Sequence, residues 1–249
     1  MIKRSRGELK RLAREYLLGN YTAVMFAMVL AFLLPSFLLA PFSAGLTMEW
    51  NAAMMMYLLA AVIIEILGRL LQTGVLRMHL LLARRQKTGI GDLFWVFRNR
   101  PDRLILATVL FYAILAVPVL AAGVCIYCFL PESTAGRAVF LAGVLAVTAV
   151  VELYLIYMFE LIYPLYLEHP QMTVLEGFRE SERLMQGNKK RLFFLQLSFL
   201  GWQLLGLCSI GVGMLWIAPY MRQTTANFYL DLTGSLDSPD KMPEDPDRI

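Results

Sequence analysis

The chain is poor in charged residues and in the side chains that most catalytic sites need. Charged residues make up 17% of its 249 residues, and it has three cysteines and two histidines. It contains no GxSxG, HExxH, P-loop or dinucleotide-binding glycine motif. The two histidines, His79 and His169, lie toward opposite ends of their apolar segments. We therefore expect no enzyme activity, no cofactor and no metal ion.

The cysteines give little support for redox chemistry. Cys125 and Cys128 form a CxxC pair, and Cys208 stands alone. A CxxC pair indicates thiol chemistry when it lies in a thioredoxin-like βαβ pattern. Here the pair lies near the end of an apolar segment without that pattern. Ordinary helix packing is the preferred interpretation, and a redox role stays open.

We also expect neither a cleavable signal peptide nor a large extramembrane domain. About 20 mostly polar residues precede the first apolar run, so we expect the N-terminus to be retained. Apolar residues are in excess: 58% of the chain is hydrophobic and the mean hydropathy is +0.59. A soluble domain is about 45–50% apolar. The excess falls in blocks of span length, which predicts a transmembrane protein.

The apolar blocks predict six crossings by one all-α transmembrane bundle over residues 1–232. The expected spans are 21–40, 54–82, 104–130, 138–167, 192–209 and 213–231. The last two divide one long run at the glycine-rich stretch 209–213, since glycine pairs mark turns. Five crossings with a long kinked final helix is the alternative. We expect the acidic tail, 233–249, to be disordered.

Basic residues predict the orientation. Six Lys or Arg precede Tyr21, six lie in 83–103 and five in 168–191, whereas 41–51 has none and 131–137 has one. Positive charge marks cytoplasmic segments. The N-terminus is therefore expected in the cytoplasm, and with six crossings the C-terminus also.

Three lead-in segments before the spans look alike. They are 15–20, 94–99 and 182–188, and each ends in asparagine. The first and third also have a Gly-Asn pair, which can end a helix. Capping boxes are expected at Ser5 with Glu8 and at Thr173 with Glu176. We interpret the fold as three hairpins, each preceded by a short cytoplasmic interfacial helix; chance similarity is the alternative.

The lead-in segments have apolar faces. Val174, Leu175, Phe178 and Met185 can share one face, and Leu9, Leu12 and Tyr16 form a similar stripe. Such helices lie in the headgroup plane, where basic residues attract anionic lipid. We therefore expect the bilayer as partner and no nucleic acid. Anchoring is the preferred role, and docking of a membrane-protein partner or a second copy is the alternative.

Polar residues inside the spans are the candidate functional residues, because ionised groups at that depth are costly and usually face a partner or a cavity. They are Glu65, Arg69, Gln72, Glu152, Glu160, Gln203 and Arg222. Glu65 and Arg69 are four residues apart and can pair on one helix face. Glu152 has no cation within a turn, so it is the first candidate for a titrating group. The set predicts either a hydrated pathway or a satisfied polar network.

Several motifs resemble a known family. They are Arg6–Lys10, Leu18–Tyr21, Leu184–Lys189, Leu197–Trp202 and Ile210–Trp216, followed by Ala218-Pro219-Tyr220. Together they resemble an uncharacterised integral membrane family of Gram-positive bacteria, a domain of unknown function. The resemblance implies a multi-helix fold in the bacterial cytoplasmic membrane and no particular activity. A fainter similarity is to the membrane domain of some bacterial glycerophosphodiesterases, although no catalytic domain accompanies it here.

Two functions stay open. The preferred one is a membrane interaction or scaffold protein that acts through its interfacial helices. The alternative is a small transporter or exporter with a polar intramembrane pathway. Hydration of the polar residues separates them, because a transporter must admit water to its pathway from at least one side.

Overall fold

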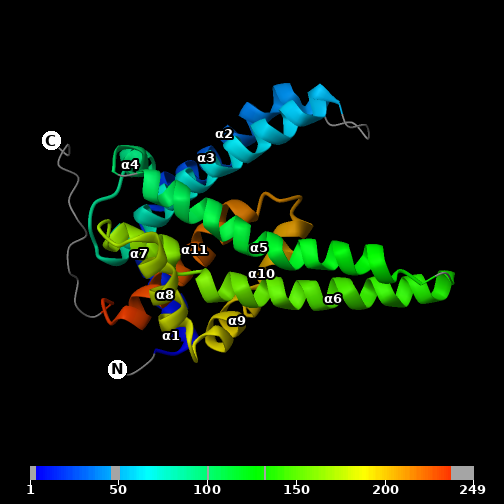
Figure 1. Ribbon diagram of the computed structural model, residues 1–249. Helices are drawn as coiled ribbons and strands as arrows, with labels where there is room; N and C mark the ends of the chain where they lie inside the picture. The colour runs from blue at the N-terminus through cyan, green and yellow to red at the C-terminus, as the bar shows by residue number, and fades with distance from the viewer. Residues whose placement is uncertain (1–3, 46–50, 100, 132, 237–249) are drawn as a thin grey trace.

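The computed structural model describes residues 4–45, 51–99, 101–131 and 133–236. Within these ranges the chain is helical and has no strand (Figure 1). Most of the expected tail, 237–249, lies outside the described residues. The predicted all-α fold is confirmed.

The first hairpin follows a short amphipathic helix. Helix α1 spans Arg6–Leu17, α2 spans Tyr21–Leu39 and α3 spans Ala52–Ala83, with a 3₁₀ helix at Ala40–Gly45. Helices α2 and α3 pack closely against each other.

The second hairpin is the longest. A 3₁₀ helix at Ile90–Phe94 and the single-turn α4, Trp95–Arg98, lead into α5, Pro101–Phe129. Helix α6, Thr134–Phe159, returns beside α5, and α7, Ile162–Glu168, continues it after a break. The expected span 138–167 is therefore two helices.

The third hairpin is shorter. It consists of the amphipathic α8, Val174–Met185, then α9, Lys189–Leu197, α10, Leu200–Cys208, and α11, Met214–Thr233. The chain turns between α10 and α11 at the glycine-rich stretch, as expected. The predicted span 192–209 is broken at Ser198, which ends α9.

Among the described residues, five helical segments are long and apolar enough to cross a membrane. They are Tyr21–Ser43, Ala52–Ala83, Pro101–Phe129, Thr134–Glu168 and Lys189–Cys208. The chain is therefore a polytopic membrane protein. Helix α11 is not among these five, so the sixth crossing stays a prediction.

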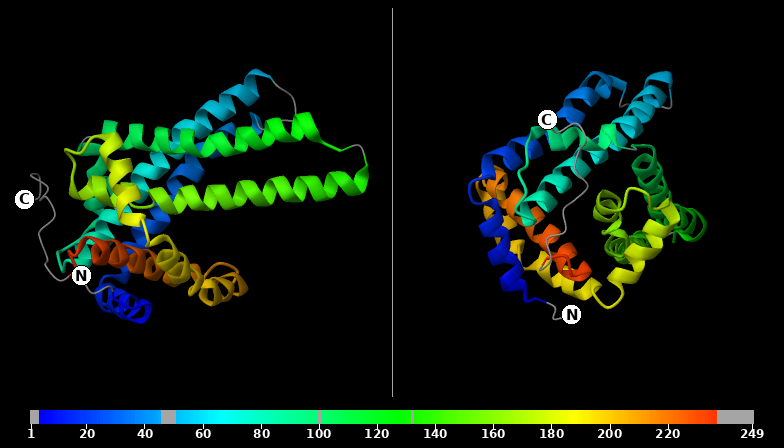
Figure 2. Two further views of the ribbon diagram at one scale, coloured as in Figure 1. Left: turned by 60° about the horizontal axis from the view of Figure 1, so that its bottom comes forward. Right: turned by 90° about the vertical axis from the view of Figure 1, so that its left-hand side faces the viewer.

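The short helices gather at one end of the molecule, which we call the base: α1, α4, α7 and α8. From the base, the α2–α3 and α5–α6 hairpins extend in diverging directions (Figure 2). The distal part of α6 is exposed over most of its surface, with Val139 74% and Leu145 62% exposed. In a membrane protein such a surface is solvated by lipid tails.

The first and third hairpins begin with nearly the same backbone path. Ser5 and Thr173 cap α1 and α8 with φ/ψ of −71°/156° and −72°/158°. Gly19 and Gly187 both have positive φ, 83° and 73°, which glycine adopts without steric cost. The middle lead-in has no such glycine, and its helix α4 is a single turn that Asn99 caps at its C-terminal end.

The apolar faces of α1 and α8 turn toward other helices. Helix α1 buries Leu9, Ala13 and Leu17 and packs mainly on α11. Helix α8 buries Phe178 and Met185 and packs on α6 and α7. Leu175, expected on the same apolar face, is 62% exposed. These two helices are thus part of the core at the base.

A buried polar contact joins the three hairpins at the base. Arg84, the C-cap of α3, forms an ion pair with Glu168 at the end of α7. Tyr229 on α11 donates a hydrogen bond of 2.7 Å to the other oxygen of Glu168. One residue from each hairpin therefore takes part, and each charge has a partner, which buried charges require.

A second buried pair fixes the link between the first two hairpins. Arg77 on α3 and Asp92 lie 3.7 Å apart, with side chains 1% and 2% exposed. The Arg77 guanidinium also stacks over the Trp95 ring at 4.0 Å. Beside them, Gly74 lets the backbone of Leu93 approach α3 directly.

Gly74→Ala is expected to lower the free energy of unfolding in detergent by about 1–3 kcal/mol or more, a range typical of overpacking. A Cβ at Gly74 would lie 2.0 Å from the Leu93 carbonyl oxygen, and a backbone atom cannot rotate away. The measurement is the thermal midpoint of the purified protein. Gly123→Ala is the matched control, since nothing lies within 4 Å of its Cβ and alanine favours a helix. Equal midpoints for the two variants would refute this packing.

Candidate functional site

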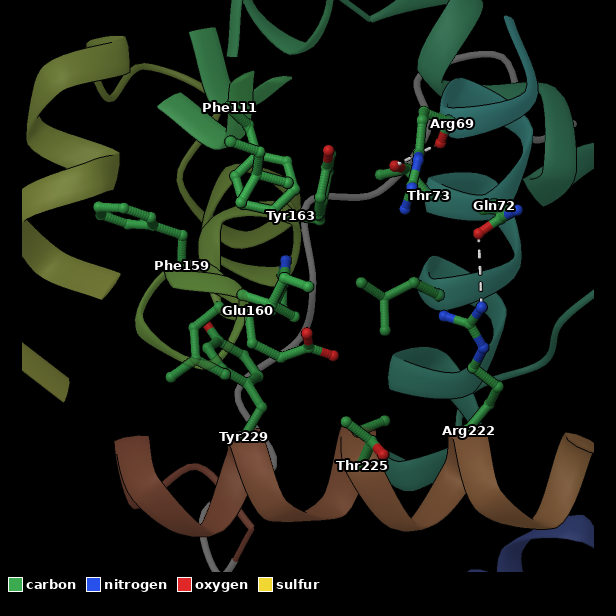
Figure 3. Close-up of a pocket in the computed structure, with 16 residues that line it drawn as sticks. Arg69, Gln72, Thr73, Phe111, Phe159, Glu160, Tyr163, Arg222, Thr225 and Tyr229 are labelled. Atoms are coloured by element: carbon green, nitrogen blue, oxygen red, sulfur yellow. Dashed lines mark hydrogen bonds between the residues drawn. The ribbon is translucent and has the colours of Figure 1, made fainter. Parts of the chain in front are cut away.

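A cavity of about 190 Å³ lies where the three hairpins meet, near the base (Figure 3). This volume is large enough for on the order of six water molecules at ~30 Å³ each. Its polar lining comes from α3, from the α6–α7 region and from α11. These residues are Arg69, Gln72, Thr73, Glu160, Tyr163, Arg222, Thr225 and Tyr229. Apolar side chains such as Phe111, Leu115 and Phe159 complete the wall.

Pro164 explains why Glu160 lies at this cavity. A proline has no N–H and its ring clashes with the carbonyl four residues earlier, which breaks a helix. The residue four positions before Pro164 is Glu160. It lies in the break between the end of α6 at Phe159 and the start of α7 at Ile162. Figure 3 shows the Glu160 side chain pointing from this break into the cavity, toward α3 and α11.

Arg222 enters the cavity from the opposite side. It rises from α11 toward α3, where its Nη2 donates to Gln72 Oε1 at 3.4 Å (Figure 3). The same two residues also border a second cavity of about 130 Å³ beside Phe32 of α2. Within the described chain, neither Arg222 nor Glu160 forms a direct ion pair.

Arg69 is the most strongly held of the lining cations. Its Nε donates to Glu65 Oε1 at 3.2 Å and to Tyr112 Oη at 2.7 Å. The Tyr112 hydroxyl donates in turn to the same Glu65 oxygen at 2.5 Å. The predicted Glu65–Arg69 pair is therefore present, and a tyrosine of α5 joins it.

The structure brings four of the seven candidates to one cavity: Arg69, Gln72, Glu160 and Arg222. Glu65 does not line the cavity, but it pairs with Arg69, which does. Glu152, the first candidate from the sequence, lies elsewhere, and its Oε1 is buried without a hydrogen-bond partner in the described part of the chain. Gln203 also lies outside the cavity and contacts Met221 Sδ at 3.7 Å.

A buried network on α11 holds the cavity wall in place. His79 Nδ1 lies 2.9 Å from Gln223 Oε1, and Gln223 Nε2 donates to the His79 carbonyl and to Asn227 Oδ1. Asn227 Nδ2 donates to the Leu9 carbonyl at 3.2 Å. All three side chains are fully buried. Helices α1, α3 and α11 are thereby tied together next to Arg222.

Sequence reasoning missed several residues of the site. Tyr112, Thr225 and Tyr229 look like ordinary interfacial or helix-packing residues in the sequence. Glu160 was among the predicted candidates, and Pro164, four residues later within the same expected span, is the sequence signal for the helix break beside it. The break allows that carboxylate to leave the helix wall and face the cavity.

The fold and the cavity define a polytopic all-α membrane protein with a charged internal cavity. The chain belongs to the family described as "Protein of unknown function (DUF975)", whose family model matches residues 1–235. No curated protein and no solved structure matches the chain. The uncharacterised-family resemblance is confirmed, whereas the fainter glycerophosphodiesterase similarity stays unconfirmed.

Glu65→Gln is expected to destabilise the protein, because it leaves the Arg69 guanidinium without its counter-charge. The loss in unfolding free energy should exceed the ~0.3–0.5 kcal/mol of an exposed helix pair. Glu15→Gln supplies that reference, since Glu15 pairs with Arg11 at 3.1 Å on the exposed side of α1. Thermal midpoints in one detergent compare the two; the same shift in both would contradict the assigned role of Glu65.

Glu152→Gln is expected to leave the thermal midpoint unchanged or to raise it. The buried oxygen of Glu152 has no hydrogen bond to lose, and a neutral amide costs less to bury than a carboxylate. The yield of monodisperse protein and its thermal midpoint test this. A clear loss of folded protein would show that Glu152 makes an ionic contact essential to the fold.

Proposed function

We propose that this protein is a small membrane transporter or exporter, and that the cavity between its hairpins is the ligand site. One observation carries the proposal. Charged residues from all three hairpins, Arg69, Glu160 and Arg222, face a single cavity, and Arg69 and Glu160 belong to candidate membrane spans. Ionisable groups inside membrane proteins typically mark ion or substrate pathways.

The arrangement of the walls supports a transport role. Ligand sites in transporters lie between repeated units and next to interrupted helices. Here the first and third units start with matching backbone turns at Gly19 and Gly187, and α6 is interrupted at Glu160. Movement of one hairpin against another would change access to the cavity from the two sides.

The base is assigned to the cytoplasm of a bacterial plasma membrane. The support for this orientation is the positive charge of the segments before Tyr21, at 83–103 and at 168–191, which lie at the base. The cavity lies near this end, so in the described state a ligand would come from the cytoplasm. No covalent chemistry is part of the proposed role.

A scaffold role, preferred from the sequence, is the second candidate. The exposed apolar surface of the α5–α6 hairpin is compatible with a membrane-protein partner, but lipid tails satisfy it equally well. The apolar faces of α1 and α8, the expected docking surfaces, are used inside the protein. The cavity therefore favours transport.

Water access to the cavity tests the proposal. In a variant without Cys125, Cys128 and Cys208, single cysteines replace Thr225 or Leu115, which both line the cavity. A small membrane-impermeant thiol reagent added from the cytoplasmic side should label both positions. Labelling should fall when Glu160 or Arg222 is occupied by ligand.

Val147→Cys is the matched control, because Val147 is 66% exposed near the middle of α6 and should face lipid. It should stay unlabelled in membranes and react only after solubilisation in denaturant. Folded protein in which neither Thr225→Cys nor Leu115→Cys reacts from either side would mean a dry polar core. That outcome would exclude a transport pathway here.

A further inference from the structure

The charges around the cavity are balanced in number but not all paired. Arg69 and Arg222 are positive, whereas Glu65 and Glu160 are negative. Arg69 is already neutralised by Glu65 at 3.2 Å. The pair that remains, Glu160 and Arg222, belongs to opposite walls and makes no direct ion pair (Figure 3).

A ligand must match this distribution because the site lies among membrane helices. Charges among membrane helices are poorly screened because the dielectric constant is low, so an uncompensated charge is costly there. A singly charged ligand would neutralise either Glu160 or Arg222 and leave the other alone. A ligand with one positive and one negative group satisfies both and keeps the site neutral.

The lining also suits each end of such a ligand. The guanidinium of Arg222 is a planar donor that recognises carboxylate or phosphate oxygens. Aromatic rings from Phe111, Phe159 and Tyr163 line the cavity together with Glu160, and aromatic faces attract ammonium groups. Leu76 and Leu115 offer apolar contact for a body between the two charges.

We propose that the cavity binds a small zwitterion, with its ammonium group against Glu160 and its acid group against Arg222. This inference rests on the proposed function and names its substrate class. The cavity volume of about 190 Å³ limits the ligand to a small one. Two sources carry this chemistry: a free amino acid with an apolar side chain, or the ethanolamine phosphate headgroup of a lipid.

The first arm of the test compares three soluble probes of one shape. Leucine is a zwitterion, leucinamide is a cation, and N-acetylleucine is an anion. Thermal stabilisation of the purified protein, titrated over probe concentration, gives apparent affinities. Leucine should bind about tenfold or more tightly than either derivative, as expected for the loss of one charged contact.

The second arm tests the lipid source. Dihexanoyl phosphatidylethanolamine carries the zwitterionic headgroup, and dihexanoyl phosphatidylglycerol is its anionic counterpart with the same tails. Stabilisation by the first lipid alone, without an effect of leucine, would assign the headgroup as ligand. Stabilisation by leucine alone would assign a free amino acid.

Charge-removing variants test the two contacts. Glu160→Gln leaves the site with one net positive charge, so binding should shift toward the anionic probe. Arg222→Gln should shift binding toward the cationic probe. If this variant does not fold, Arg222→Lys replaces it, and this variant should keep the preference for the zwitterion. Glu152→Gln is the matched control, because Glu152 lies on the same helix outside the cavity.

Two results would overturn the ligand class. One is a wild-type protein stabilised by neither leucine nor the ethanolamine lipid, and the other is an unchanged preference in Glu160→Gln. If Thr225→Cys is nevertheless labelled from the aqueous side, the transport proposal stands and only the zwitterion is wrong. If neither Thr225→Cys nor Leu115→Cys is labelled in folded protein, both proposals fail together.

Discussion

The arrangement of the hairpins depends on the buried contact among Arg84, Glu168 and Tyr229. Each residue comes from a different hairpin, and Tyr229 also lines the cavity. Because a buried charge without its partner is strongly destabilising, these three groups keep their neighbours in one geometry. Away from the base the two long hairpins diverge. The cavity lies just beyond this joined end, where the helices begin to separate.

Polar residues in this protein fall into two groups with different roles. The pairs at Arg77 and Arg84, and the network at His79, Gln223 and Asn227, are buried and connect helices. Arg222 and Glu160 instead face a cavity and lack a direct ionic partner in the described chain. The first group fixes the walls, and the second gives the cavity its chemical character. Buried contacts that hold the walls in place, next to charged groups that face a cavity, are what a preorganised binding site requires.

Much of the architecture follows from sequence patterns, because membrane spans, basic flanks and caps depend on local composition. The helix starts at Ser5 and Thr173, the turns at Gly19 and Gly187, and the Glu65–Arg69 pair were all predictable. The site was predictable only in part. Glu160 faces the cavity and Glu152 does not, because Pro164 breaks the helix at Glu160. The position of Arg222 on the opposite wall depends on tertiary packing between α3 and α11. No pattern within a single span contains that information.

The lengths of α5 and α6 make the tilt of this hairpin sensitive to the thickness of the bilayer. With 29 and 26 residues at ~1.5 Å per residue, these helices are roughly 40 Å long. The hydrocarbon core is about 30 Å thick, and a helix that exceeds it tilts or thickens the bilayer around it. Lipids with shorter or longer chains would therefore change the inclination of this hairpin relative to α3 and α11. Bilayer thickness thus acts on the width of the gap between hairpins, as a mechanical input that requires no ligand.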